Sequence, residues 1–110
     1  MAAIWRTRDP LGREIVLNEE RRDHILTRHP ALAARLDEIR TTVEQPDFIT
    51  RDRRFGHREN VYRRTTSAPG WIKVVVHFRP IPPQGAWSGE VITAYYVCPL
   101  IHISEPTRPY

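Results

Sequence analysis

The sequence WIKVVVHFR at residues 71–79 decides the fold, because its side chains divide into two sets at the spacing of a β-strand. One set is apolar and consists of Ile72, Val74, Val76 and Phe78. The other set consists of Lys73, Val75, His77 and Arg79. Successive side chains of a strand point to opposite faces of a sheet. We therefore expect one face to pack on helices and the other to remain available.

Three further stretches rich in β-branched and aromatic residues predict strands that accompany this one. They are residues 48–50, 60–65 and 90–97. Turn-forming sequences separate them: Gly56, SAPG at residues 67–70, and a Pro- and Gly-rich loop at residues 80–89. The pattern predicts a four-stranded antiparallel sheet.

The N-terminal part of the chain predicts a hairpin and two helices. Residues 4–8 and 14–17 flank the turn sequence DPLG at residues 9–12, which is typical of a β-hairpin. Asn18 is a suitable N-cap for a helix that runs to about Arg28 and ends before Pro30. A second helix is expected to start near Pro30 and to end at Pro46. Its apolar stripe has helical spacing: Leu32, Leu36, Ile39 and Val43. We therefore expect an α+β domain with two helices packed on the sheet.

The composition fits one globular domain, since the chain has 110 residues, of which 40% are hydrophobic and 27% charged. No stretch approaches the roughly 20 apolar residues of a membrane span, and the N-terminus lacks the apolar core of a signal peptide. We expect a cytoplasmic protein that does not bind membranes. Cys98 is the only cysteine, which excludes an internal disulfide and zinc sites built from several thiols. We expect it to be a reduced residue of a strand.

The charge distribution favours a polyanionic partner. The formal net charge is +4, and sixteen of the seventeen basic residues are arginine. Six of them lie in a segment of fourteen residues whose only acids are Asp52 and Glu59: Arg51, Arg53, Arg54, Arg58, Arg63 and Arg64. Because clustered guanidinium groups bind phosphates well, we expect RNA as a partner.

The sequence HILTRHP at residues 24–30 places two imidazoles and a guanidinium just before a proline. Histidine transfers protons near neutral pH, and arginine binds phosphate, so the combination favours chemistry on a phosphodiester. His24 and His29 are five positions apart, about 140° around an ideal helix. They can face one site only if the helix ends near Arg28.

Several of these motifs also resemble a known family. The sequences concerned are DPLGREIVL at residues 9–17, Glu20-Arg21, His24-Ile25, RHP at residues 28–30, Pro46-Asp47, Arg58, Tyr62-Arg63 and VITAY at residues 91–95. Over residues 9–97 the chain resembles the phage-associated nucleases of the barnase, EndoU, colicin and RelE-like (BECR) superfamily. The resemblance implies two helices packed on a four-stranded antiparallel sheet. It also implies a metal-independent endoribonuclease, toxin-like or phage-associated, that uses no cofactor.

RNA cleavage without a metal needs a base, an acid and fixed cations around the phosphate. We assign catalytic roles to His24, His29, Arg63 and Thr93. We assign substrate binding to Arg28, Arg58, Tyr62 and Lys73, with Tyr62 stacking a base. Arg63 either lies half-buried beside Val61 and needs a carboxylate or phosphate partner, or is exposed while Tyr62 packs inward. Thr93 either donates its hydroxyl to a phosphate or serves only as a β-former.

Two other functions stay open. Arg22 and Ala31 stand where the family pattern has an aromatic residue and an acid, which suits a catalytically inactive module that binds RNA or a phage protein. A metal-dependent hydrolase is the third interpretation. It lacks ligands, because the two helix histidines are not at i, i+4 spacing and no nearby acid completes a set. We therefore expect no metal site.

Two further expectations concern partners and the end of the chain. A nuclease that acts on cellular RNA has to be neutralised in its own host, so an antitoxin or immunity protein is an expected partner. The sequence LIHISEPTR at residues 100–108 resembles the translation of a sequencing adapter. We expect a nuclease domain over residues 1–99 and a non-native tail over residues 100–110.

Overall fold

The computed structural model describes residues 2–65, 70–81 and 86–97. These residues form β1 (Ala3–Arg8), β2 (Glu14–Asn18), α1 (Glu19–Arg28), the 3₁₀ helix η1 (Pro30–Leu32), α2 (Leu36–Glu44), β3 (Phe48–Arg51), β4 (Arg58–Thr65), β5 (Gly70–Ile81) and β6 (Ala86–Val97). Within these ranges no helix has the length and apolar character of a membrane span. The predicted boundary at residue 99, the tail and Cys98 lie outside the described residues.

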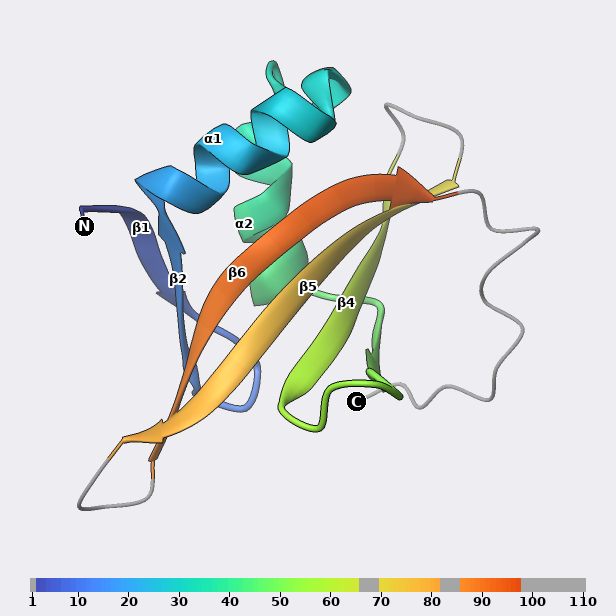
Figure 1. The fold of residues 1–110 in the computed structure, drawn as a ribbon. Coiled ribbons are helices and arrows are strands. Elements are labelled where there is room, and N and C mark those ends of the chain that lie inside the picture. The colour runs from blue at the N-terminus through green and yellow to red at the C-terminus, as the bar shows by residue number, and fades with distance from the viewer. Residues whose placement is uncertain (1, 66–69, 82–85, 98–110) are drawn as a thin grey trace.

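The α+β class and the two α-helices are confirmed, and the four predicted strands pair antiparallel with one another, but they are part of a larger, mixed sheet. The described strands form one six-stranded sheet in the order β1-β2-β6-β5-β4-β3. β1 and β2 pair as the predicted hairpin, and β2 also pairs with β6 in parallel, with Ile15 opposite Gly89. All other neighbouring strands are antiparallel. The hairpin thus extends the sheet (Figure 1).

The hairpin joins the sheet because β6 begins earlier than the sequence pattern indicates. β5 runs to Ile81 and β6 starts at Ala86, so most of the loop expected at residues 80–89 belongs to strands. Gly89 permits this extension. A Cβ atom at Gly89 would lie 2.7 Å from Cε1 of Phe78 and 2.7 Å from Cγ1 of Val76. Glycine inside a strand often marks such a close approach, whereas in the sequence it indicated a loop.

The first helix matches its prediction, but the second does not start at Pro30. Pro30–Leu32 form a 3₁₀ turn, and α2 begins only after Arg35, whose φ of −138° and ψ of 35° are not helical. The turn changes the direction of the chain between α1 and α2. Leu32, Ile39 and Val43 therefore reach the same core and are completely buried, and Leu36 packs against it half-buried.

The two faces of the sheet differ in what covers them. Both helices lie on one face, here termed the helix face, with α2 behind the sheet in the view of Figure 1. The apolar set of β5 packs there against Ile25 of α1 and Ile39 of α2, and each of its side chains is at most 3% exposed. The alternation predicted for residues 71–79 is confirmed. The opposite side, here termed the helix-free face, carries the polar set of β5.

Candidate functional site

Cross-strand pairing sorts the side chains of the helix-free face into three rows. The Lys73 row consists of Phe48, Tyr62, Lys73 and Tyr95, the middle row of Thr50, Asn60, Val75 and Thr93, and the His77 row of Arg58, His77 and Glu90. Successive rows are two residues apart along β4 and β5, which is about 7 Å. The Lys73 row and the His77 row are therefore about 13 Å apart.

A β-bulge in β6 brings Glu90 to the helix-free face. Thr93 pairs with Val75, but the next pair along β5 joins Val76 to Val91, so β6 has one extra residue. The extra residue reverses the alternation of β6. Thr93 and Glu90 consequently lie on the same face although they are three positions apart. Bulges of this kind are frequent beside active sites.

Lys73 is held between two tyrosine rings. Its Nζ lies 5.9 Å from the ring centroid of Tyr62 and 5.4 Å from that of Tyr95. Burial lowers the pKa of Lys73, but its hydrogen bond to Tyr95 and its interaction with Tyr62 outweigh burial and raise the pKa. Tyr62 is only 6% exposed and stacks on Phe48, with 4.8 Å between the ring centroids. The ring of Tyr62 therefore lies beside Lys73 with little exposed surface, and its stacking on a base stays a prediction.

His29 extends the Lys73 row beyond Tyr95. The two rings stack with 5.1 Å between centroids and an interplanar angle of 26°. This placement follows from the end of α1, since Arg28 is its last residue and the His29 N–H donates to the carbonyl of Ile25 at 2.7 Å. Burial lowers the pKa of His29, and the charges of Arg28 and His24 lower it further. The imidazole is therefore neutral at pH 7 and able to accept a proton.

The His77 row places an imidazole between a guanidinium and a carboxylate on neighbouring strands. Burial lowers the pKa of His77, and the charges of Arg58 and Arg79 lower it further. His57, whose ring centroid is 6.5 Å away, acts in the same direction, whereas Glu90 raises the pKa. In the described part of the chain, three polar atoms in or beside this row are buried with no hydrogen-bond partner: Nε of Arg58, Oδ1 of Asn60 and Nδ1 of His77.

Five of the eight residues that the sequence predicted for the site come together on the helix-free face or at its edge. They are His29, Arg58, Tyr62, Lys73 and Thr93. His24 and Arg28 are exposed on α1. Their charges act on His29, so they lie near this edge of the site.

Arg63 does not join this group. It pairs with Ile72, whose side chain lies on the helix face, and it donates to the carbonyl oxygen of Gln45 at 2.6 Å. Of the two orientations considered for Arg63, the half-buried one beside Val61 is observed. Its partner in the structure is a main-chain oxygen just after the end of α2, where cations are favoured by the helix dipole.

The row residues for which the sequence predicted no role include Tyr95, His77 and Glu90. Tyr95 lies two positions from Thr93, so the alternation along β6 was a sufficient signal for it. His77 was placed on the correct face by the pattern of residues 71–79, but that pattern did not identify its neighbours. Glu90 gave no signal, because the bulge reverses the alternation before it.

The rows offer imidazole, ammonium, phenol and guanidinium groups, which suit proton transfer and phosphate binding. Among residues 2–65, 70–81 and 86–97, no three His, Cys, Asp or Glu side chains are close enough together to hold a metal ion. Comparison with known proteins adds no assignment: no family model, no curated protein and no solved structure matches this chain.

Proposed function

We propose that the helix-free face binds single-stranded RNA and cleaves its backbone by acid–base transesterification without a metal ion. The observation that carries this proposal is the Lys73 row with His29 at its end, since an ammonium group, a phenol and a neutral imidazole follow one another there in contact. The net charge of +4 supports an anionic substrate. The motifs that resemble BECR nucleases support the same class of reaction.

In the proposed reaction, the neutral imidazole of His29 removes the proton from a ribose 2′-hydroxyl. The 2′-oxygen attacks the adjacent phosphorus, and the bond from phosphorus to the 5′-oxygen breaks. The ammonium of Lys73 stabilises the charge that develops on the phosphoryl oxygens. Tyr95 accepts a hydrogen bond from Lys73 and donates its own hydroxyl proton to the leaving 5′-oxygen. The products are a 2′,3′-cyclic phosphate and a 5′-hydroxyl.

The test is the digestion of mixed cellular RNA by the full chain in the presence of a chelator. The unmodified protein should produce fragments with 2′,3′-cyclic phosphate ends. His29→Ala should lower the rate by about 10²-fold or more, because it removes the general base. Thr27→Ala changes an exposed residue in the last turn of α1, two positions before His29, and should retain the rate. Intact RNA with the unmodified protein, or equal cleavage by His29→Ala, rejects the proposal.

A module that binds RNA without cleaving it is the second candidate. The two imidazoles with lowered pKa, those of His29 and His77, belong to rows about 13 Å apart. That separation is too large for both to act on one phosphate, and Arg63 faces away from both. This candidate predicts intact RNA that is retained with an affinity falling steeply as salt rises. An antitoxin or immunity protein is expected only for the nuclease.

A further inference from the structure

The His77 row and the adjacent Asn60 contain polar atoms that have no partner among the described residues. Nε of Arg58, Nδ1 of His77 and Oδ1 of Asn60 are buried and make no hydrogen bond within residues 2–65, 70–81 and 86–97. The three residues lie on the same face of two paired strands, with Arg58 directly opposite His77. Folded proteins pair nearly all of their buried polar atoms. Three unpaired atoms in one place therefore indicate a bound group that supplies the missing partners.

The carboxylates near this row are engaged by other groups. Glu90 accepts a hydrogen bond from Nδ2 of Asn18 at 2.7 Å and lies 4.0 Å from Arg21 and 3.9 Å from Arg79. Asp52 accepts two backbone hydrogen bonds within its own loop, at 2.8 Å and 3.1 Å. Among the described residues, neither carboxylate forms an ion pair with the guanidinium of the row. The Arg58 guanidinium stacks on Phe55, with 4.2 Å between Cζ and the ring centroid, so its N–H groups rather than this face are left to an anionic ligand.

We propose that Arg58 and His77 bind a phosphate group, and that Asn60 binds the ribose hydroxyl next to it. Phosphate oxygens accept hydrogen bonds from Nε of Arg58 and Nδ1 of His77, and a planar guanidinium suits phosphate geometry. A 2′-hydroxyl can donate to the unpaired Oδ1 of Asn60, whose Nδ2 donates to Thr50 at 3.5 Å. This inference rests on the proposed function, because RNA is the substrate class that supplies both groups.

The proposed phosphate site is separate from the reacting centre. About 13 Å lies between the two rows, so the phosphate bound by Arg58 and His77 differs from the one that lies beside Lys73. One strand of RNA then contacts the protein at two of its phosphates. The value of kcat/KM should therefore rise when a dinucleotide substrate is lengthened enough to reach both rows.

Histidine-ring NMR of the full chain, titrated with inorganic phosphate, tests this site without any cleavage. The ring signals of His77 should shift, and its pKa should rise by about one unit, as expected beside a bound anion. Arg58→Leu should weaken phosphate binding about tenfold. Arg58→Lys keeps the charge but loses the planar donors, and should weaken binding less. Arg64→Leu changes an exposed arginine of the same strand and face, and should leave binding unchanged.

Adenosine 3′-monophosphate and its 2′-deoxy counterpart test Asn60. The unmodified protein should bind the ribonucleotide about tenfold more tightly, and Asn60→Leu should remove the difference. Unchanged His77 signals, or an equal response in Arg58→Leu, overturn the inference. If His77 responds to phosphate but RNA stays intact, the phosphate site stands and the proposed reaction fails. If RNA is cleaved while His77 does not respond to phosphate, the proposed reaction stands and the phosphate site fails.

Discussion

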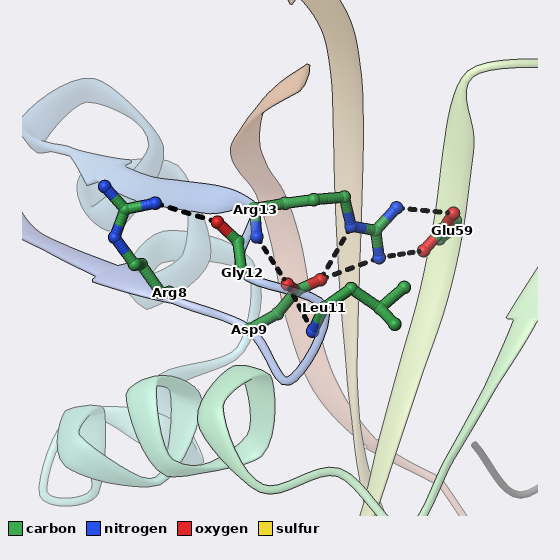
Figure 2. A network of polar contacts seen from close by, with 6 residues as sticks. All are labelled: Arg8, Asp9, Leu11, Gly12, Arg13 and Glu59. Atoms are coloured by element: carbon green, nitrogen blue, oxygen red, sulfur yellow. Dashed lines mark hydrogen bonds and ion pairs between the residues drawn. The ribbon is translucent and has the colours of Figure 1, made fainter. Parts of the chain in front are cut away.

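Arg58 and Glu59 are neighbours on β4, yet they belong to polar clusters of two different kinds. Glu59 points to the helix face, where it forms ion pairs and hydrogen bonds with Arg13, which also binds Asp9 (Figure 2). Arg58 points to the helix-free face beside His77, where buried polar atoms have no partners. The comparison separates polar side chains that hold the fold together from those that are available to a ligand.

Asp9, Arg13 and Glu59 are here termed the paired cluster. This cluster connects the hairpin turn to β4 across the two strands between them, β6 and β5. Arg13 donates to Asp9 through Nε at 2.8 Å and to Glu59 through Nη1 and Nη2 at 3.0 Å and 2.9 Å, as Figure 2 shows. Its guanidinium also lies 4.0 Å from the ring centroid of Phe78. Burial lowers the pKa of Arg13, but the hydrogen bonds to Glu59 and Asp9 outweigh burial and raise it.

The largest loss of stability is expected for Arg13→Met. The change leaves the buried carboxylate of Asp9 and that of Glu59 without their cation, and breaking such a pair lowers the free energy of unfolding by about 3 kcal/mol. Arg6→Met removes only an exposed ion pair with Glu14 and should cost less than about 0.5 kcal/mol. Urea denaturation measures both values. Equal losses would contradict a structural role for the paired cluster.

Gly89→Ala tests the close packing beneath the same cluster. A Cβ would meet Phe78 and Val76 at 2.7 Å, so we expect the free energy of unfolding to fall by about 2 kcal/mol. Gly56→Ala is the matched control, because no atom lies within 4 Å of its Cβ position. Thermal unfolding of the two variants should differ clearly. Similar midpoints would mean that β6 tolerates a side chain at residue 89.

On the helix-free face, removal of a polar group is expected to have the opposite effect on stability. His77→Phe removes an unpaired buried atom, so the free energy of unfolding should stay the same or rise by up to about 1 kcal/mol, while phosphate binding is lost. Thr42→Val removes a buried hydroxyl that donates to Glu38 at 2.6 Å, and should cost about 1 kcal/mol. Equal losses of stability in urea would mean that the unpaired imidazole of His77 supports the fold as much as the paired hydroxyl of Thr42 does.

The smallest expected effect is a dependence of stability on pH. Burial lowers the pKa of His29 and His77 below the ordinary value of 6.5, so the unfolded chain binds more protons between 6.5 and the folded-state values. The contribution of these two histidines to the free energy of unfolding should therefore be constant above pH 6.5 and should fall as the pH drops below 6.5. Urea titrations of the unmodified protein and of a His29→Gln, His77→Gln double variant measure the difference. The assigned sign would be wrong if acidification below pH 6.5 raised the free energy of unfolding of the unmodified protein but not that of the double variant.

The face occupied by each side chain of β5 could be predicted from the sequence. A strand that packs on helices by one face keeps its apolar set on that face, as Val74 and His77 illustrate. The joining of the hairpin to β6 could not be predicted, because it depends on Gly89 as a strand residue and the pattern indicated a loop. The cluster around Arg13 could not be predicted from the sequence either, since its partner Glu59 is 46 positions away along the chain.

The candidate site was predicted in part for similar reasons. Pro30 indicated where α1 ends, and that end places His29 at the edge of the sheet. Its stacking on Tyr95 depends on how α1 packs against β6, which no local pattern encodes. The orientation of Arg63 required a choice between two faces of β4, and only the pairing of Val61 with Val74 decides it.

The most direct test of the account is a map of backbone amide chemical shifts on addition of an RNA oligonucleotide whose 2′-hydroxyls are replaced by fluorine, so that it cannot be cleaved. We predict the largest shifts at Lys73, His77, Thr93 and Tyr95 on the helix-free face, and little change at Asp9 and Arg13. Shifts centred on the paired cluster instead, or no shifts at all, would contradict the assignment of the helix-free face as the RNA site.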